Sequence, residues 1–548
     1  MAKTSDKIVE IPTTWTTGWT DIFNTGTWRS AVPVHQHRPA PCHKACPVNG
    51  EIPTWIQQLK NGEHREAWLS LTANNPFPAV IGRVCHHPCE LECNRNEYDE
   101  KVSVKALERY LGDLALEKDW KLHIMNLSRK EKIAIVGAGP AGLSAAYQLR
   151  RRGFAVTVYE AQQKPGGLLY YGIPSYRLPQ NILNGEIERL LQTGIELKTG
   201  ALLTNPADFK KLKETYAAVF IATGAQHKPG LKDLDDKPEY LDGLKFLEQI
   251  NTGIPAIPGP KVVVVGGGNT AVDAARSALR LGSREVIILY RREREQMPSS
   301  AEEILEAEEE GVKLELLAAP LALQRDGKKN TLLCQRTQLG EPDESGRQRP
   351  VVVEDETFAI ELDTLIGATG TQADLTPLKG LLDLEGQADA GNGFFAGGDL
   401  ISAERYVSCA ISAGHLGAIE IYRYLGFEED NREEENDPVA FKEINTFYFP
   451  SKPTLKKYKE PVETRTEDFR EVEAGILLDQ VVAESERCFS CGNCLYCDNC
   501  FYFCPDMAVQ RDESLEEGYR VLDQYCKGCG LCAAECPRGA IVLKEELK

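Results

Sequence analysis

The chain has 548 residues, 42% of them apolar, and a formal net charge of −19 at pH 7. This length predicts three or four domains with ample buried cores, and the acidic balance argues against nucleic acid as a partner. No basic and then apolar leader suggests secretion, and no apolar run is long enough to span a bilayer, so we expect a cytoplasmic protein. Its 17 cysteines gather near the two ends, apart from Cys334 and Cys409, which is unlike a secreted disulfide scaffold.

The N-terminal cysteines lie in two short segments, "PCHKACPVNG" from Pro41 and "GRVCHHPCELECN" from Gly82. The thiols are those of Cys42, Cys46, Cys85, Cys89 and Cys93.

A first nucleotide-binding fingerprint follows an apolar strand predicted at Ile133 to Val136. Gly137-x-Gly139-x-x-Gly142 then opens an Ala- and Leu-rich helix, where glycines allow a tight turn and close approach of a pyrophosphate to the helix N-terminus. The next predicted strand, "AVTVYE", ends in Glu160, which is placed to bind a ribose hydroxyl. Strand, glycine turn, helix, second strand and acid follow one another at the expected spacing, so the pattern is specific for dinucleotide binding.

A second fingerprint, Gly266-x-Gly268-x-x-Ala271, follows the apolar strand "KVVVV" from Lys261. The strand after it, "EVIILYRR", ends in Arg291 and Arg292 instead of an acid. Arginine accommodates the 2′-phosphate of NADP, whereas an acid binds the 2′-hydroxyl of NAD, so we favour NADP and keep NAD open. The alternative interpretation of the two arginines is a solvated strand end.

Three further segments resemble the two-dinucleotide flavoprotein pattern, in which the second Rossmann domain is inserted into the first. They are "IATG" (Ile221 to Gly224), "GATG" (Gly367 to Gly370) and "FFAGGD" (Phe394 to Asp399). The resemblance implies that Asp399 binds the ribityl or pyrophosphate part of FAD. It also implies that the two ATG segments cross between the domains.

After an acidic run at Glu428 to Asp437, interpreted as a linker, two cysteine runs read C-x2-C-x2-C-x3-C-P. This is the ligand spacing of a bacterial two-cluster ferredoxin, in which the fourth cysteine of each run ligates the other cluster. The first predicted [4Fe–4S] cluster has Cys494, Cys497, Cys500 and Cys536 as ligands, and the second has Cys526, Cys529, Cys532 and Cys504. Zinc, the alternative, needs four ligands, whereas eight occur here in matching runs.

The combination resembles the small subunit of glutamate synthase and the N-terminal part of dihydropyrimidine dehydrogenase over roughly residues 40 to 425. The N-terminal cysteine segments, "PGGLLYYGIPSYRLP" (Pro165 to Pro179) and "YRREREQMP" (Tyr290 to Pro298) carry this resemblance. With the fingerprints, it assigns cofactor contacts to Gly137, Gly139, Pro140, Ala141, Gly142, Glu160, Gly167, Leu168, Arg177, Thr223, Gly224, Gly266, Gly268, Asn269, Thr270, Ala271, Arg291, Arg292, Thr369, Gly370, Gly398 and Asp399.

The resemblance also implies an N-terminal cluster on Cys46, Cys85 and Cys89 with a Gln or Glu as fourth ligand, a position that falls on Glu108. The alternative is that Glu108 is an ordinary helix-surface residue. One feature departs from the family: an "RC-x2-C" pair is absent before Cys42, where the chain has "VHQHRPAPC". His35 and His37 in this stretch are interpreted as loop residues in preference to metal ligands.

That departure leaves Cys42 and Cys93 without partners, while "ESERCFSC" holds two cysteines, Cys488 and Cys491, that the ferredoxin runs do not use. Two spare ligands at each end make one set of four. We therefore predict a composite [4Fe–4S] cluster that joins the ends, giving four clusters; if Cys488 and Cys491 are spare thiols, the protein has three.

The predicted fold is α/β with five parts. They are a helical iron–sulfur domain with an N-terminal extension (1–125), an FAD domain (130–255 and 366–426), an inserted NAD(P) domain (256–365), a linker (427–483) and an α+β ferredoxin domain (484–548). Nicotinamide gives a hydride, flavin splits the electron pair and clusters carry single electrons, so no catalytic side chain is required.

The leading hypothesis is an electron-transfer subunit that passes electrons between NADP(H) and a larger catalytic subunit or a ferredoxin. The resemblance leaves glutamate synthase, a 2-oxoacid:ferredoxin oxidoreductase and a sulfite-reductase-type enzyme open as partners. A free-standing NADPH:ferredoxin reductase and a flavin/iron–sulfur redox sensor are the other hypotheses.

Overall fold

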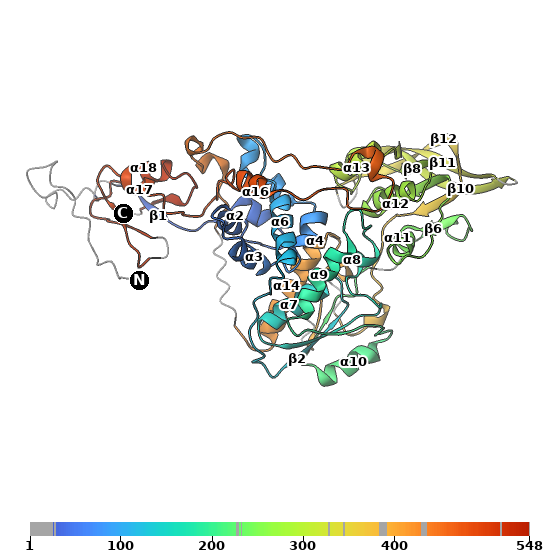
Figure 1. Cartoon of the computed structure of the whole chain (residues 1–548), viewed down its shortest axis with the longest axis horizontal. Helices are drawn as coiled ribbons and strands as arrows, with labels where there is room; N and C mark the ends of the chain where they lie inside the picture. The colour runs from blue at the N-terminus through green and yellow to red at the C-terminus, as the bar shows by residue number, and fades with distance from the viewer. Residues whose placement is uncertain are drawn as a thin grey trace, which may run out of the picture.

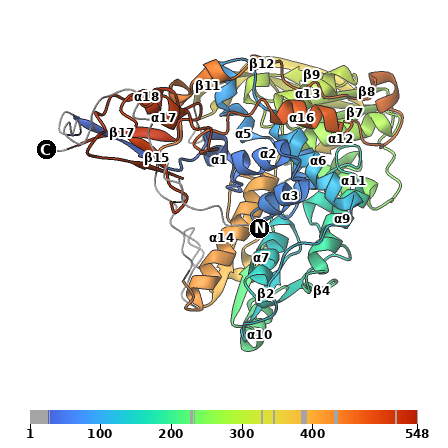
Figure 2. The same ribbon diagram turned by 60° about the vertical axis from the view of Figure 1, so that its left-hand side comes forward.

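The computed structural model describes residue 26 and residues 29–225, 230–231, 233–326, 329–342, 346–382, 392–428, 436–515 and 518–546. Figure 1 shows an elongated molecule with the cysteine-rich C-terminal module at one end and the second nucleotide-binding domain at the other. The N-terminal helices lie between them, and Figure 2 shows the same order from another side. Most of the predicted N-terminal extension and most of the acidic run from Glu428 to Asp437 lie outside the described residues.

The N-terminal domain is a compact group of helices, as predicted. They are α1 (Pro41–Ala45), α2 (Ile52–Lys60), α3 (His64–Thr72), α4 (Pro78–Val84), α5 (Pro88–Leu91), the 3-10 helix η4 (Asn94–Glu97) and α6 (Val104–Glu117). Four of them have proline in the first turn, where a missing N–H costs nothing. Trp55 and Trp68 are fully buried between them and fix the packing of α2 against α3.

The first nucleotide-binding domain is a five-stranded parallel sheet in the order β14-β5-β2-β3-β4. Its strands are β2 (Lys132–Val136), β3 (Ala155–Tyr159), β4 (Glu196–Lys198), β5 (Ala218–Ile221) and β14 (Phe394–Ala396). The helices are α7 (Pro140–Arg151), α8 (Leu168–Tyr171), α9 (Gln180–Leu191), α10 (Pro206–Thr215) and α14 (Val407–Tyr424). The long α14 packs closely on α7, because Gly414 leaves no side chain between them: a Cβ there would lie 2.1 Å from the Ala141 carbonyl oxygen.

The second domain is inserted between β5 and β14 and has its own parallel sheet, in the order β6-β13-β7-β8-β9. The strands are β6 (Tyr240–Asp242), β7 (Lys261–Val265), β8 (Glu285–Tyr290), β9 (Lys313–Leu316) and β13 (Thr364–Gly367), with helices α11 (Gly243–Asn251), α12 (Asn269–Arg280) and α13 (Ala301–Glu309). An antiparallel sheet of β10 (Ala318–Asp326), β11 (Lys329–Pro342) and β12 (Gln348–Leu362) extends from it.

The insertion is confirmed, but the predicted limits of 256–365 are wrong. β6 pairs with β13, and α11 packs on α12, so the second domain begins at about residue 240 and ends with β13 at Gly367. β6 has only three residues, which is too short to show an apolar pattern in the sequence.

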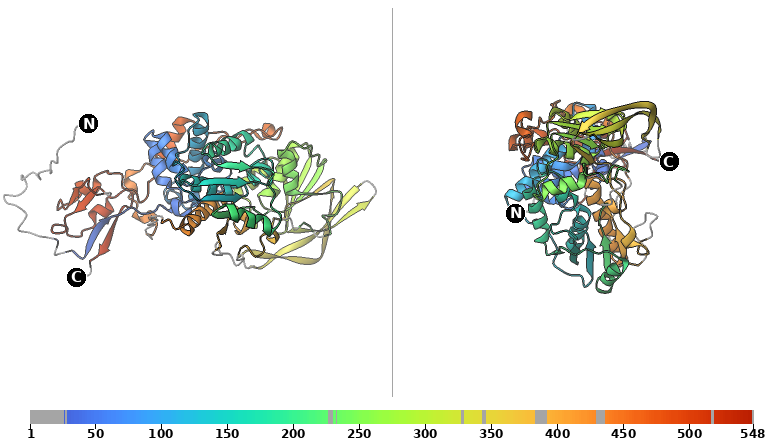
Figure 3. Two further views of the ribbon diagram at one scale, coloured as in Figure 1. Left: turned by 90° about the horizontal axis from the view of Figure 1, so that it is seen from below. Right: turned by 90° about the vertical axis from the view of Figure 1, so that its right-hand side faces the viewer.

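The C-terminal module contains α17 (Asn499–Tyr502), α18 (Leu531–Ala534), the hairpin β15 (Val509–Arg511) and β16 (Tyr519–Val521), and β17 (Ile541–Glu545). Its last strand is paired with β1 (Ala31–His35), from the other end of the chain. Figure 3 shows this blue strand beside the red module, away from the helices that follow it in sequence. Residues 31–35 therefore pack with the ferredoxin module, whereas the predicted 1–125 boundary had assigned them to the helical domain.

The segment predicted as a linker is packed against all four other domains over its described part, 436–483. It contains two 3-10 helices, η8 (Phe441–Glu443) and η9 (Thr446–Tyr448), then α15 (Val462–Arg465) and the start of α16 (Leu478–Ser485). Glu471 binds Arg83 and Arg109 of the helical domain, while Arg465 binds Glu310 of the inserted domain. The linker interpretation is therefore wrong for these residues, because their charges are paired within the molecule instead of being solvated. No helix in the described ranges is long and apolar enough to cross a membrane.

Glu186 on α9 links the helical domain to the first sheet and gives a testable dependence of stability on pH. Its buried carboxylate accepts the Val80 N–H at 3.0 Å, and burial raises its pKa to about 7, although Arg189 opposes the shift. The folded state thus holds a proton that the unfolded chain releases near pH 4.5, so this contribution is present below pH 4.5 and is lost as the pH rises through about 7.

Replacing Glu186 with glutamine is expected to remove this loss, because the amide oxygen still accepts the Val80 N–H and does not ionise. Relative to the variant, the wild-type protein loses roughly 2–3 kcal/mol of unfolding free energy between pH 4.5 and 8. Denaturant unfolding at several pH values measures the difference. Glu188→Gln, at an exposed position of the same helix, is the control and leaves the pH profile unchanged.

Candidate functional site: a dinucleotide cavity beside cysteine groups

A cavity of about 640 Å³ lies at the carboxyl ends of the strands of the first sheet. Gly137 has φ of +105°, and a Cβ there would lie 2.3 Å from the Ala222 carbonyl oxygen, so only glycine fits this turn. A Cβ at Gly142 would lie 1.9 Å from the Gly137 carbonyl oxygen. At Gly139, by contrast, no atom lies within 4 Å of the Cβ position, which leaves the backbone open to the cavity.

Glu160 lies where the fingerprint predicts, immediately after β3 and on the cavity wall. Its Oε2 accepts the Ala138 N–H at 2.7 Å and its Oε1 accepts the Gln162 N–H at 2.8 Å. These bonds fix the carboxylate against the glycine-rich loop. The remaining lone pairs of the carboxylate can accept hydrogen bonds from the hydroxyls of a ribose.

The other predicted FAD contacts surround the same cavity, except Gly142, which packs beneath its floor. The lining residues from this set are Gly137, Gly139, Pro140, Ala141, Glu160, Gly167, Leu168, Arg177, Thr223, Gly224, Gly398 and Asp399. The cavity lining therefore combines open backbone at a helix N-terminus, an acid and apolar walls, which fits a dinucleotide.

Arg177, which lines the cavity, also makes ion pairs that the sequence did not predict. Its guanidinium pairs with Asp273 at 2.6 Å and also with Glu303, both from the inserted domain. Arg177 therefore joins the two nucleotide-binding domains across the cavity.

The second fingerprint opens onto the same cavity. Asn269 and Thr270, at the start of α12, line it, whereas Gly266, Gly268, Ala271, Thr369 and Gly370 are not part of its wall. In the described chain, the buried Oδ1 of Asn269 has no hydrogen-bond partner, so a bound ligand can supply one. The two fingerprints thus bring two dinucleotide sites to one space.

The two arginines after β8 have different environments. Arg291 is exposed, whereas Arg292 is 5% exposed and donates through Nε to the Gln348 carbonyl oxygen at 2.6 Å. Arg291 is therefore open to a 2′-phosphate, and Arg292 ties β8 to the antiparallel extension.

The N-terminal cysteine group adjoins the cavity. Burial raises the pKa of Cys85 to about 12, and the neighbouring Glu108 and Cys46 raise it further; Cys46 and Cys85 likewise add to the raised pKa of Cys89. The four predicted ligands of this cluster, Glu108 included, are therefore close together. Glu108 is not an ordinary surface residue: burial raises its pKa to about 8, and Asn75 Nδ2 donates to its Oε1 at 2.6 Å.

His86 is a site residue that the sequence interpretation missed. It follows Cys85 directly, lines the cavity and contacts Asn269 through Nε2 at 3.1 Å. Its ring packs on Tyr406, with 4.6 Å between centroids, and burial lowers its imidazole pKa. The "CHH" sequence was the available signal. A residue of the cavity wall is thus the direct neighbour in sequence of a cysteine of the N-terminal group.

The C-terminal cysteines gather in the two sets that the spacing predicts. Burial raises the pKa of Cys500 to about 12, with Cys494, Cys536 and Cys497 as the nearest thiols that raise it further. For Cys532 the corresponding neighbours are Cys504, Cys526 and Cys529. The fourth cysteine of each run thus lies with the other run, and Cys497 and Cys529 are exposed.

His35 is not the loop residue predicted. It ends β1, its ring stacks on Tyr519, and its Nε2 lies 3.4 Å from the Cys500 sulfur. No group of three or more His, Cys, Asp or Glu side chains in the described ranges is compact enough for a single metal ion. A four-iron cluster is larger than one ion and takes ligand sulfurs that are farther apart.

Two dinucleotide sites that meet beside groups of buried cysteines define a flavin- and nicotinamide-dependent iron–sulfur oxidoreductase. Three family models match the chain. Residues 131–381 match pyridine nucleotide-disulphide oxidoreductase, residues 33–120 match dihydropyrimidine dehydrogenase domain II with its 4Fe-4S cluster, and residues 520–542 match a 4Fe-4S binding domain.

The chain is 37% identical to the NADP(+)-dependent formate dehydrogenase subunit beta of Moorella thermoacetica, over 82% of this chain and 70% of that protein. It is 34% identical to the NADPH-Fe(3+) oxidoreductase subunit beta of Geobacter sulfurreducens, over 82% of this chain and 75% of that one. Identity to the glutamate synthase [NADPH] small chain of Azospirillum brasilense is 32%, over 70% and 86%. The chain belongs to this glutamate synthase small-chain-like family of oxidoreductases, which use FAD, NADP and iron–sulfur clusters.

Proposed function

We propose that the protein is the NADPH-oxidising subunit of a hetero-oligomeric enzyme and delivers single electrons to a catalytic partner through its C-terminal module. The relatives from Moorella and Geobacter are named as beta subunits, which supports the presence of a further, catalytic subunit. The observation that carries the proposal is the order of sites along the molecule: one cavity with two dinucleotide fingerprints, cysteines directly beside it, and exposed cysteines at the far end.

The protein's contribution is to bind, orient and separate the redox groups. FAD, when bound, would supply hydride acceptance from NADPH and release of the electrons one at a time, which suits iron–sulfur clusters because each carries one electron. Glu160 and the open backbone at Gly139 hold the flavin nucleotide, and the start of α12 with Arg291 holds NADPH. Arg177 fixes the distance between the two domains through its pairs with Asp273 and Glu303.

Electrons leave the flavin side at Cys85, since Val84 and His86 on either side of it line the cavity. The electrons leave the protein at the ferredoxin module, where Cys497 and Cys529 are exposed. Tyr502 and Phe503, which lie between Cys500 and Cys504 of the first cysteine run, are 72% and 45% exposed and provide an apolar surface for the partner.

Anaerobic reduction of the holoprotein tests the proposal. Mixing with NADPH is expected to bleach the flavin absorption band first and the broad cluster absorption afterwards. If NADPH reduced the flavin while the clusters that are present stayed oxidised, the proposed direction of electron flow from flavin to clusters would be wrong. Purification from the native host under mild conditions is expected to yield a stoichiometric larger subunit. Full-rate reduction of a soluble ferredoxin by the chain alone would instead favour a free-standing reductase.

A further inference from the structure

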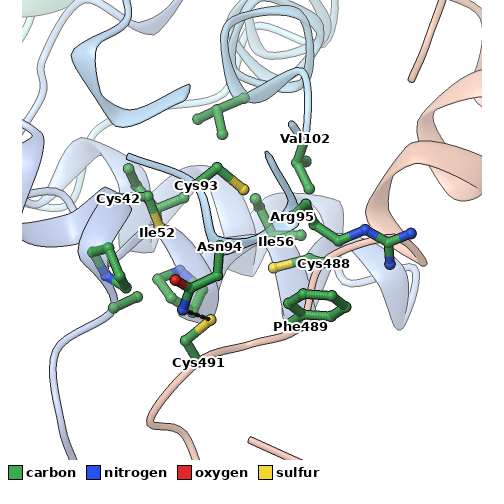
Figure 4. Close-up of a pocket in the computed structure, with 14 residues that line it drawn as sticks. Cys42, Ile52, Ile56, Cys93, Asn94, Arg95, Val102, Cys488, Phe489 and Cys491 are labelled. Carbon is green, nitrogen blue, oxygen red and sulfur yellow. Dashed lines mark hydrogen bonds between the residues drawn. The ribbon is translucent and has the colours of Figure 1, made fainter. Parts of the chain in front are cut away.

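A small cavity where segments from the two ends of the chain meet has four cysteines in its lining. Figure 4 shows Cys42 and Cys93 on the N-terminal side and Cys488 and Cys491 on the C-terminal side, with their sulfurs around one space. The rest of the lining is mainly apolar, including Ile56 and Phe489. Nearly 400 residues separate the two pairs along the chain.

The four thiols are near one another in the folded protein. All four line the same cavity, and the sulfur of Cys491 lies 3.4 Å from the side-chain amide nitrogen of Asn94, the residue after Cys93. Such a group of buried thiols has little stabilising contact unless it binds a soft metal centre, for which thiolates are the preferred ligands. All four are free cysteines, so they form no disulfide.

The Cys488–Cys491 loop has the backbone conformation of the two ferredoxin ligand loops. In each, the residues just before and just after the second cysteine are in the left-handed region. Their φ angles are 51° at Ser490 and 78° at Gly492, 53° at Tyr496 and 64° at Asp498, and 68° at Gly528 and 79° at Gly530. Serine and tyrosine rarely adopt this region, and successive N–H groups in such a nest form concavities that bind iron–sulfur clusters.

The Cys488–Cys491 loop also resembles a ferredoxin ligand loop in its hydrogen bonds to sulfur. The Ser490 N–H donates to Cys488 Sγ at 3.4 Å, as the Gly528 N–H donates to Cys526 Sγ at 3.4 Å. Asn94 adds a second donor, with its Nδ2 3.4 Å from Cys491 Sγ. N–H groups directed at sulfur are the contacts by which proteins adjust the potential of a cluster.

The cavity lies between the other cysteine groups. Cys42 also has Cys46 of the N-terminal group nearby, and Cys491 is followed three residues later by the ferredoxin ligand Cys494. On the module side, the Gly492 N–H donates to the Arg538 carbonyl oxygen at 2.7 Å, and Arg538 Nη1 donates to the Phe489 carbonyl oxygen at 2.5 Å. These contacts hold the loop against the segment that follows Cys536.

We propose that Cys42, Cys93, Cys488 and Cys491 together bind a [4Fe–4S] cluster shared by the two ends of the chain. It connects the N-terminal group to the ferredoxin module, and its role as an electron carrier rests on the function proposed above. The existence of the cluster does not depend on that function, because its ligands are assigned from the cysteines that line the cavity. Together with the N-terminal cluster and the two ferredoxin clusters it makes four.

Iron analysis of anaerobically purified protein tests the proposal through a cycle of variants. The wild-type chain is expected to hold about sixteen irons, since four cubanes hold four each. Cys488→Ala/Cys491→Ala and Cys42→Ala/Cys93→Ala are each expected to hold about twelve, and the quadruple variant also about twelve, because both pairs serve one cluster. Cys409→Ala, outside every cysteine group, is the control and keeps about sixteen.

An unchanged iron content in either pair variant, zinc in place of the lost iron, or a further loss in the quadruple variant would each overturn the proposal. Only preparations with stoichiometric FAD are compared, which excludes misfolded protein. Alkylation with iodoacetamide needs no variant: these four cysteines are expected to react only after the iron is removed, and reaction in the native holoprotein contradicts the assignment. A protein with all sixteen irons whose clusters NADPH cannot reduce would refute the proposed function and leave the site intact.

Discussion

Replacing Cys529 with alanine is expected to abolish electron delivery to an external acceptor while NADPH still reduces the bound FAD. Cys529 is an exposed member of the set with Cys504, Cys526 and Cys532, so its loss removes one cluster, or about four irons, at the exit of the molecule. The flavin cavity is built from other residues at the opposite side of the helical domain. Stopped-flow absorption measures flavin reduction, and steady-state reduction of a dye or ferredoxin measures delivery.

The Cys529 experiment tests whether the C-terminal clusters receive electrons after the flavin. Cys409→Ala, in α14 and apart from the clusters, is the matched control and should retain both activities. If the Cys529 variant kept its FAD but lost flavin reduction, the C-terminal module would lie upstream of the flavin. Retained delivery at the wild-type rate would show that electrons leave by another route.

Replacing Arg291 with glutamine is expected to raise the KM for NADPH roughly ten- to a hundredfold, because a charge-assisted hydrogen bond to phosphate contributes about 1.5–3 kcal/mol. The KM for NADH should change little, since NADH has no 2′-phosphate. Steady-state kinetics with both nucleotides and a dye acceptor provide the measurement. Arg292 is unsuitable for this test, because its side chain is bound to the Gln348 carbonyl oxygen and its loss would disturb β8.

Arg294→Gln is the control for Arg291. Arg294 lies three residues further on and is already paired with Glu308, so its removal lowers the local positive charge without removing a free guanidinium. A similar rise in KM for both variants would mean that general charge, and not a specific contact, attracts NADPH. Equal use of NADH and NADPH by the unmodified protein would refute the NADP specificity of the site.

The parts of the fold that the sequence predicts are those with local signals. Both fingerprints, at Gly137 and Gly266, place a strand, a glycine turn and a helix in consecutive residues, and both sheets form where they indicate. The cysteine spacing likewise predicts which thiols meet in the ferredoxin module, because the pattern repeats within about forty residues. The ligand roles of these cysteines and the nucleotide contacts stay predictions.

Features that depend on distant partners could not be predicted in the same way. Strand β1, "AVPVH", has a proline and five residues, and its pairing with β17 has no local signal. The charged segment around Arg465 and Glu471 looks like a solvated linker until its partners on two other domains are known. Arg177 belongs to a motif that suggests a flavin contact, yet Asp273 and Glu303 bind it, and nothing in the motif indicates them.

The pairing of β1 with β17 also constrains how the protein can be made. Residues 31–35 are synthesised roughly 500 residues before their partner strand at 541–545. At ~5–20 residues per second, the early strand waits roughly half a minute to two minutes with its backbone unpaired. This two-stranded sheet therefore cannot form until residues 541–545 have been synthesised, and protein that lacks either strand lacks one side of it.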